Sequence, residues 1–296
     1  SGGSLEGKAV RSSLCLFATE ALGEEPEKAL PAAVSLELVH NFSLVHDDIQ
    51  DDADVRRGKE SVRKIWGENQ AINAGDGLKD LSLLAFSRLG DSKSSPGTRL
   101  RAITEISRRS LRMIDGQVKD LLYSERENVE VSEYLEMVGQ KTCALLEASF
   151  YLGGLYAGAE EKLGDLDLLG EHLGYLYQIR DDWLGIWGEP ERSGKSAKTD
   201  LVEKKKTYPV VYALENAEGN SSDKMHEIYS SGKRMEAEEI DTVRAILEET
   251  GAKSGTEKLA EKHWKKAEGI IDELDLPERE QRKLERFGKF LLRREK

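Results

Sequence analysis

The sequence predicts an all-α protein folded as a single domain, and three features support this prediction. Proline is scarce, at 6 of 296 residues, which favours long helices. Stretches rich in Leu, Ala, Glu and Lys outweigh runs in which Val or Ile alternates with polar residues. No segment between these stretches has the length and composition of a flexible linker, and a hydrophobic fraction of 38% is ample for a core.

Apolar residues recur at helical spacing in six segments, which are separated by Gly, Pro, Ser or charged residues. We expect helices over residues 29–52, 69–89, 98–123, 131–156, 166–186 and 208–216. The chain from residue 236 to its end is strongly charged, so we expect it to form an outer layer of helices.

The composition argues against several classes of protein. A formal net charge of −12 disfavours nucleic acid as a partner, because phosphate backbones are bound by excess Lys and Arg, but it leaves room for a small diphosphate. No apolar run approaches the ~18 residues of a membrane span, and we expect a cytoplasmic protein. Cys15 and Cys143 lie in apolar segments and are expected to be buried thiols. The chain opens at Ser1 without Met, so we expect its natural start to be missing or replaced.

Two groups of aspartates follow apolar residues at helical spacing: Asp47, Asp48 and Asp51, and then Asp181 and Asp182. Residues three and four apart share one face of a helix, so the first three carboxylates repel one another unless a cation lies between them. Mg²⁺ is the natural candidate, because it binds one or two carboxylates together with substrate phosphates. The alternative is a solvated acidic surface, which fits less well beside a core.

Basic residues follow both acidic groups. Arg56 and Arg57 could bind phosphate oxygens bidentately next to a metal, or could simply neutralise neighbouring aspartates at the surface. Lys195 and the three lysines at 204–206 come after the second group, and Gln178 lies one turn before it. The sequence therefore indicates two acidic sites, each with cations close by.

Lys141 and Thr142 form a third candidate, because they lie inside an otherwise apolar helical segment. A lone lysine in such a segment often extends its ammonium group to solvent, which is the structural alternative to binding an anion.

Both acidic groups resemble the aspartate-rich motifs of the trans-isoprenyl diphosphate synthases. Residues 46–51 read His-Asp-Asp-Ile-Gln-Asp and, with Arg-Arg-Gly-Lys at 56–59, resemble the first motif. Residues 177–182 read Tyr-Gln-Ile-Arg-Asp-Asp and resemble the second. Further markers that resemble the family extend over nearly the whole chain: Gly-Lys-Ala-Val-Arg at 7–11, Gly-Asp at 75–76, Gly-Gln at 116–117 with Asp120, Lys-Thr at 141–142, Gly-Lys at 194–195 and Asp-Leu at 200–201.

This resemblance implies one isoprenyl diphosphate synthase domain over residues 1–296, with an incomplete N-terminal helix. The implied fold is a helical bundle around a deep central cavity, with the two motifs facing each other across its mouth. About three Mg²⁺ ions would hold an allylic diphosphate there, and isopentenyl diphosphate would be the second substrate. The family also implies a homodimer.

The resemblance further implies roles for single residues. The metal ligands would be Asp47, Asp48, Asp51, Asp181 and Asp182. The allylic diphosphate would be bound by Arg56, Lys141, Thr142, Gln178, Lys195 and Lys205, and isopentenyl diphosphate by Lys8, Arg11, Arg57 and Arg63. The residues closest to the chemistry would be Asp47, Asp48, Asp51, Lys141, Asp181 and Lys195.

The implied reaction needs no nucleophilic side chain. Metals and cations would stabilise the departing diphosphate, and the alkene of isopentenyl diphosphate would attack the allylic carbocation. In agreement, no HExxH motif and no GxSxG motif is present, and no Ser/His/Asp arrangement stands out among only 5 His.

Two positions depart from the family pattern. Gly185 stands where the second motif usually carries a third aspartate, so a metal there would lose one ligand. Arg63 stands where a His commonly helps to bind isopentenyl diphosphate, and Arg can bind phosphate as well.

Product length in the family depends on the residues just before the first motif. Phe42 and Ser43 lie about one turn, roughly 6–7 Å, deeper along the helix than Asp47. A single Phe at the deeper position resembles enzymes that make geranylgeranyl diphosphate, with twenty carbons. Farnesyl diphosphate, with fifteen carbons, is the less favoured alternative, and Phe42 could also serve core packing alone.

Two other functions stay open. A class I terpene cyclase shares the ionisation step but has no use for the second diphosphate site at Lys8, Arg11 and Arg57. A non-catalytic regulatory subunit of a prenyl synthase is compatible with the missing aspartate at Gly185, although the intact first motif argues against it.

Overall fold

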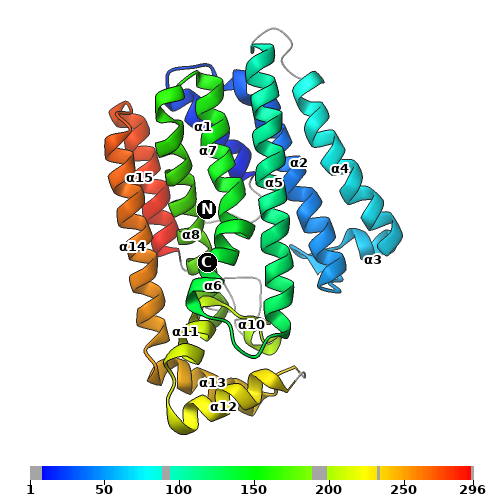
Figure 1. Cartoon of the computed structure of the whole chain (residues 1–296), viewed down its shortest axis with the longest axis vertical. Coiled ribbons are helices and arrows are strands. Elements are labelled where there is room, and N and C mark those ends of the chain that lie inside the picture. Colours follow the sequence, from blue (N-terminus) through cyan, green and yellow to red (C-terminus); the bar gives the residue numbers. More distant parts are fainter. Residues whose placement is uncertain (1–8, 89–93, 189–198, 232–233, 295–296) are drawn as a thin grey trace. The chain divides into compact units, whose positions relative to one another are not determined.

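The chain is described by a computed structural model that covers residues 9–88, 94–188, 199–231 and 234–294 (Figure 1). Over these residues the fold is all-α, as predicted, apart from one short hairpin. The chain divides into two compact units. Unit 1 comprises Ser1–Leu111, Ala144–Gly170 and Leu274–Glu280, and unit 2 comprises Arg112–Cys143, Glu171–Glu273 and Gln281–Lys296. The single domain and the central cavity expected from the resemblance stay predictions.

Unit 1 holds the first acidic motif. Its described elements are α1 (Val10–Ala21), η1 (Pro26–Ala29), α2 (Leu30–Gln50), β1 (Val55–Arg56), β2 (Lys59–Glu60), α3 (Val62–Trp66), α4 (Glu68–Arg88), the first half of α5 (Pro96–Glu125), α7 (Ala144–Ala157), η3 (Glu160–Lys162) and the start of α8 (Leu163–Trp187). Helix α2 packs along α4, and α1 packs against α7.

Small residues bring α1 and α7 close together. A Cβ atom on Gly153 would lie 2.5 Å from the carbonyl oxygen of Cys15, so only glycine allows this approach. The hydroxyl of Thr19 donates to the carbonyl oxygen of Gly153 over 3.1 Å, which satisfies a buried polar group at the same contact. Cys15 is fully buried as a free thiol, as expected from its apolar segment.

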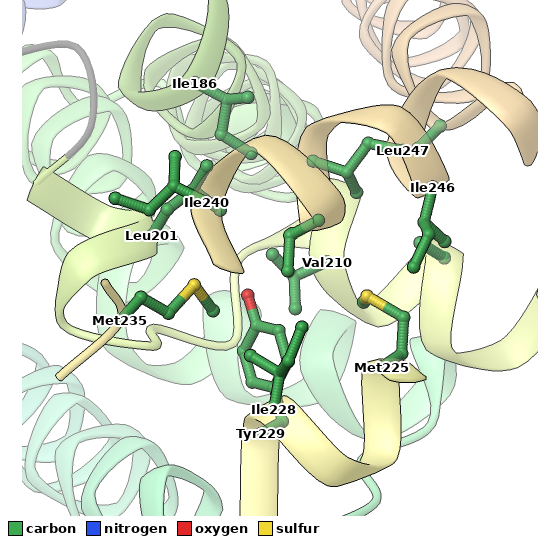
Figure 2. Close-up of a cluster of buried hydrophobic side chains, with 13 residues drawn as sticks. Ile186, Leu201, Val210, Met225, Ile228, Tyr229, Met235, Ile240, Ile246 and Leu247 are labelled. Carbon is green, nitrogen blue, oxygen red and sulfur yellow. The ribbon is translucent and has the colours of Figure 1, made fainter. Parts of the chain in front are cut away.

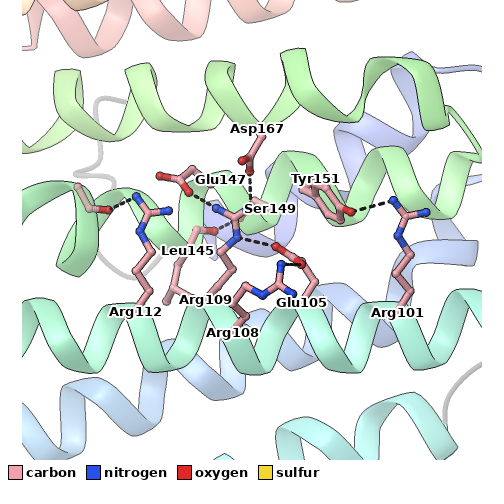
Figure 3. A network of polar contacts seen from close by, with 11 residues as sticks. Arg101, Glu105, Arg108, Arg109, Arg112, Leu145, Glu147, Ser149, Tyr151 and Asp167 are labelled. Atoms are coloured by element: carbon pink, nitrogen blue, oxygen red, sulfur yellow. Dashed lines mark hydrogen bonds and ion pairs between the residues drawn. The ribbon is translucent and has the colours of Figure 1, made fainter.

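A buried arginine links three helices of unit 1 (Figure 3). Arg109 of α5 donates to Glu105 of the same helix over 2.9 Å, to Asp167 of α8 over 2.6 Å and to Glu147 of α7. Burial disfavours its charge, but Asp167, Glu147 and Glu105 outweigh that effect and raise the pKa of Arg109 above its usual value. This guanidinium is therefore a fixed part of the interior.

Unit 2 holds the second acidic motif. Its described elements are the second half of α5, α6 (Val131–Val138), η2 (Gly139–Cys143), the rest of α8, α10 (Thr199–Val202), α11 (Tyr208–Asn216), α12 (Gly219–Ser230), α13 (Ala237–Glu249), α14 (Ala252–Glu273) and most of α15 (Glu278–Arg293). Ile186, Val210, Met225, Ile240 and Leu247 belong to one buried apolar cluster, to which α8, α11, α12 and α13 contribute (Figure 2).

The observed helices agree with the expected ones within a few residues, with one correction. The helix expected over 131–156 is interrupted at Gly139–Cys143, where η2 forms a π-helical turn between α6 and α7. Apolar spacing does not show such a turn, because it inserts one residue without ending the helix. Among the described helices, none is both long and apolar enough to cross a membrane.

Candidate active site

The first acidic motif lies at the C-terminal end of α2, and its three aspartates differ in exposure. Asp48 is buried, Asp47 is half-buried and Asp51 is exposed. Asp51 follows the last helical residue, yet its N–H still donates to the carbonyl oxygen of Asp47 over 2.8 Å. It therefore keeps the helical spacing from Asp47 that the sequence predicts.

The hairpin after α2 turns a basic residue back onto the motif. Arg57 and Gly58 form its two-residue turn, and both have positive φ, at 54° and 74°. The turn brings Arg56, on β1, to Asp48, and its Nε donates to Oδ1 over 2.6 Å. Arg56 thus neutralises a buried carboxylate of the motif itself and not the surface aspartates considered in the alternative interpretation.

The positive charges of three predicted phosphate-binding arginines act on His40, a residue that the sequence did not single out. Burial, together with the positive charges of Arg11, Arg57 and Arg56, lowers the pKa of His40 to about 2. His40 lies seven residues before Asp47, which is the same face of α2, and this spacing was the available signal. Three positive charges therefore act on one residue of α2 beside the first motif, as an anion site requires.

Arg63 is held by acids. Its guanidinium pairs with Asp52, with Asp54 over 3.3 Å and with Glu68 over 3.6 Å. The side chain is 15% exposed. The charge of Arg63, a predicted isopentenyl diphosphate ligand, is therefore engaged by three carboxylates.

Two markers of the sequence pattern meet beside α2. A Cβ on Gly75 would lie 2.1 Å from Nε2 of His46, so the absence of a side chain makes room for this imidazole. The same Nε2 lies 3.8 Å from Oδ1 of Asp76. Gly75 and Asp76 of α4 thus fix the residue that directly precedes Asp47.

The predicted chain-length residues lie on the turn before the motif. Phe42 is buried, its ring meets the ring of His46 edge-on at 5.6 Å, and Nζ of Lys79 lies 5.7 Å from the centre of the same ring. Burial lowers the pKa of Lys79. Ser43 donates its hydroxyl to the carbonyl oxygen of His40 over 2.8 Å, so its side chain folds back onto its own helix.

The second acidic motif lies on α8 in unit 2, and its first aspartate is paired with a cation. Nη2 of Arg294 donates to Oδ1 of Asp181 over 2.7 Å. The Arg294 guanidinium also lies 4.6 Å from the ring centre of Tyr177, and its backbone oxygen accepts from Nε of Arg180 over 2.9 Å. Arg294 gives no signal in the sequence, because 113 residues separate it from Asp181.

The second aspartate has a different environment. Asp182 is 4% exposed and accepts hydrogen bonds from the hydroxyl of Tyr134, from the backbone N–H of Tyr208 over 2.8 Å and from Nε2 of Gln178 over 2.9 Å. Burial outweighs the opposing effect of these hydrogen bonds, so the pKa of Asp182 is raised to about 7. Gln178 in turn accepts from Thr142 over 2.9 Å.

Lys141 and Thr142 lie in the π-helical turn η2. Nζ of Lys141 donates to Oδ2 of Asp120 over 2.5 Å. A Cβ on Gly116 would lie 2.3 Å from the backbone nitrogen of Lys141, so α5 approaches η2 closely at this glycine. The markers at 116 and 120 therefore position Lys141, and π-helical turns are frequent at functional sites.

Gly185 has an acidic neighbour from another segment. A Cβ at Gly185 would lie 2.1 Å from Oδ2 of Asp200 of α10. A carboxylate thus stands beside the position of the missing third aspartate. Lys205 is exposed and pairs with Glu203 over 3.1 Å, whereas the predicted ligands Lys8 and Lys195 lie outside the described residues.

Within the described ranges, no group of three His, Cys, Asp or Glu side chains adopts an arrangement that would hold a metal ion. Each acidic motif nevertheless binds a cation of the chain itself: Arg56 at Asp48 and Arg294 at Asp181. The carboxylate oxygens are also the donors that Mg²⁺ prefers. The chemistry of both motifs therefore fits a hard divalent cation.

Comparison with known proteins gives one consistent result. The family model described as polyprenyl synthetase matches residues 3–249. The chain is 35% identical over 294 residues to a (2E,6E)-farnesyl diphosphate synthase of Mycobacterium tuberculosis, covering 98% of this chain and 80% of that protein. A geranylgeranyl pyrophosphate synthetase structure from Pyrococcus horikoshii is similar with a TM-score of 0.90 and 33% identity, covering 97% of this chain and 86% of that one. A polyprenyl synthase from Caulobacter crescentus, complexed with calcium and isoprenyl diphosphate, gives a TM-score of 0.86 and 27% identity and covers 98% and 86%.

Proposed function

Because the chain belongs to the polyprenyl synthetase family and is a prenyltransferase, we propose that it joins isopentenyl diphosphate head-to-tail to an allylic diphosphate, with Mg²⁺. The observation that carries this proposal is the group of Arg11, Arg56 and Arg57 around His40, beside the buried Asp48. A second anion site is what a two-substrate condensation requires and what a terpene cyclase lacks.

Divalent metal would be held by Asp47, Asp48 and Asp51 in one motif and by Asp181 in the other. When bound, Mg²⁺ supplies positive charge that stabilises the departing diphosphate. Calcium in the Caulobacter crescentus relative supports divalent metal in the family. Asp48 and Asp181 already bind Arg56 and Arg294, so a metal would share or replace an existing ion pair at each.

The chain's own residues would do the remaining work. Lys141, fixed by Asp120, and Gln178, fixed by Thr142, would bind the diphosphate that leaves the allylic substrate. Arg11 and Arg57 would bind the diphosphate of the second substrate and hold its alkene in position.

The bond balance follows from these roles. The allylic C–O bond breaks, and diphosphate takes the electron pair. The alkene carbon of isopentenyl diphosphate forms the new C–C bond, and one proton is lost to the departing diphosphate. No side chain needs to form a covalent bond, so the site has to bind, orient and exclude water.

The product is proposed to be geranylgeranyl diphosphate. Phe42 is buried one turn before the first motif, with the rings of Phe42 and His46 in contact and Lys79 beside them. These side chains would form a floor that stops the growing chain. The two candidate product lengths are those in the names of the related farnesyl and geranylgeranyl synthases.

A homodimer is proposed as the working state. Leu111, Ile114, Val118 and Leu122 recur at helical spacing on α5 and are 64%, 39%, 50% and 55% exposed. An exposed apolar stripe of this kind is typical of a helix that packs against a second copy. Light scattering should give the mass of two chains, and Val118→Lys with Leu122→Lys should shift it towards one.

One experiment tests the catalytic proposal. The purified chain is incubated with Mg²⁺, labelled isopentenyl diphosphate and allylic primers of five, ten or fifteen carbons, and the products are sized. We expect twenty-carbon product, and Phe42→Ala should extend it. A terpene cyclase would instead release a hydrocarbon from a single diphosphate, and a regulatory subunit would give no product with any primer, which would contradict the proposal.

A further inference from the structure

The two neighbouring aspartates of the second motif have different surroundings. Asp181 is 40% exposed at its side chain and has an ion pair with Arg294, near the end of the chain. Asp182 is 4% exposed and receives hydrogen bonds from three elements of unit 2: α6, α8 and α11. Two adjacent aspartates thus differ in exposure and in their hydrogen-bond and ion-pair partners.

The hydrogen bonds to Asp182 occupy most of the lone pairs of its carboxylate. Oδ2 accepts from both the hydroxyl of Tyr134 and the N–H of Tyr208, and Oδ1 accepts from Nε2 of Gln178. An ionised carboxylate offers about four lone pairs, so about one remains, on Oδ1. A metal bound there would need access to an oxygen of an almost completely buried residue.

One of these bonds begins a helix. Tyr208 is the first residue of α11, and the residue before it, Thr207, makes no side-chain cap. The next residue, Pro209, has no N–H to offer. The carboxylate of Asp182 therefore takes the place of the missing cap and puts negative charge at the helix N-terminus, where it is favourable.

Another of these bonds determines how the amide of Gln178 points. Its Oε1 accepts from Thr142, and its Nε2 donates to Asp182, each over 2.9 Å. The reversed amide would turn Oε1 towards the Asp182 carboxylate, where two acceptors repel. Asp182 thereby leaves one N–H of Gln178 in a defined direction.

We propose that Asp182 is a positioning residue that fixes the amide of Gln178 and the start of α11, and that it is not a metal ligand. Within the proposed function, in which Gln178 binds diphosphate, this role acts on affinity for the allylic substrate. It divides the second motif into Asp181, which exchanges Arg294 for a metal, and Asp182, which holds the protein groups around it.

The test compares Asp182→Asn with Asp181→Asn in the full chain. Three quantities are measured: the Mg²⁺ concentration for half-maximal activity, the KM for the allylic diphosphate, and calorimetric binding of inorganic diphosphate at saturating Mg²⁺. We expect Asp182→Asn to weaken both diphosphate measures about five- to tenfold and to change the Mg²⁺ requirement less than about twofold, because the NH₂ of Asn would face a donor. Asp181→Asn should raise the Mg²⁺ requirement about tenfold or more.

A double-mutant cycle separates positioning from general damage to the fold. In a Gln178→Ala background, Asp182→Asn should add little to KM, because the amide that it positions is absent. Additive effects would overturn the proposal, as would an unchanged KM with only a lower Tm. A Mg²⁺ requirement raised as much as in Asp181→Asn would also overturn it.

If Asp182→Asn does not fold, Tyr134→Phe provides the test, because it removes a single donor to the same carboxylate. It should raise the allylic KM about two- to fivefold with an unchanged Mg²⁺ requirement, and an unchanged KM would overturn the proposal. Failure of the proposed function is a different result: the unaltered chain would then form no product.

Discussion

The replacement of Arg109 by Leu should be one of the most destabilising single changes in unit 1. The Arg109 side chain is 9% exposed, and its guanidinium pairs with Glu105 and Glu147, whose side chains are 9% and 3% exposed. Leu would remove this guanidinium from both buried carboxylates, of which Glu105 would keep only its 3.5 Å contact with Arg108, and from the partly buried Asp167. Breaking a buried ion pair by removing one partner costs about 3–5 kcal/mol.

That cost can be measured as a shift in Tm. A chain of this size loses about 2 °C for each kcal/mol, so Arg109→Leu should lower the Tm by roughly 6–10 °C. Arg108→Leu is the matched control, because Arg108 is the adjacent residue of α5, is 70% exposed and meets Glu105 only at 3.5 Å (Figure 3). It should change the Tm by about 1 °C or less.

Calorimetry of both variants, with urea unfolding as a second measure, checks the estimate. The deficit of Arg109→Leu should also shrink as the pH falls, because the stranded carboxylates can then be neutralised by protonation. A Tm for Arg109→Leu within about 2 °C of that for Arg108→Leu would refute the reasoning, since it would mean that water or rearrangement replaces the guanidinium at no cost.

Three further predictions concern the acidic motifs and acid stability. Asp47→Ala should abolish product formation in the radiolabel assay. Calorimetry without diphosphate should show that its Tm changes little. Retained turnover would show that Asp47 is not a metal ligand. Gly185→Asp should destabilise the protein by about 1–3 kcal/mol, because its Cβ would lie 2.1 Å from a carboxylate oxygen of Asp200. Its turnover should not exceed that of the unaltered chain. A Tm equal to that of the unaltered chain would show that Asp200 moves aside without cost. Burial lowers the pKa of His172 to about 4 and that of His263 to about 3, so the unfolded chain takes up protons first and stability should fall as the pH drops below about 6.5. Urea unfolding at pH 7 and pH 5 should show a loss of up to about 2 kcal/mol for each of the two histidines, which His263→Gln reduces, and equal losses in both proteins would contradict this.

The sequence predicted the local structure well, and the reason is physical. A helix is formed by contacts three and four residues apart, so α2 and α11 could be recognised from apolar spacing and their flanking residues. The π-helical turn η2 was missed, because it depends on a single inserted residue at a tightly packed position beside Gly116. Hydrogen bonding to the fifth residue leaves the apolar pattern almost unchanged.

The candidate site was predicted in its residue types and only partly in its partnerships. The sequence placed Arg56 close to the first acidic motif, since eight residues separate it from Asp48. It gave no sign of Arg294 at Asp181, or of Tyr134 at Asp182, where the partners are 113 and 48 residues apart. Such contacts depend on how whole helices pack.

The sequence by itself determined the all-α fold, the two acidic motifs, the basic residues that follow them and the likeness to prenyl synthases. These properties are set by composition and by spacing along the chain. Only the tertiary structure decided that Asp181 meets a guanidinium whereas Asp182 is buried among hydrogen-bond donors. A carboxylate can exchange its cation for a metal, or it can fix the groups around it by hydrogen bonds. Which of the two it does depends on its burial and on partners from distant segments, and a local sequence pattern contains neither.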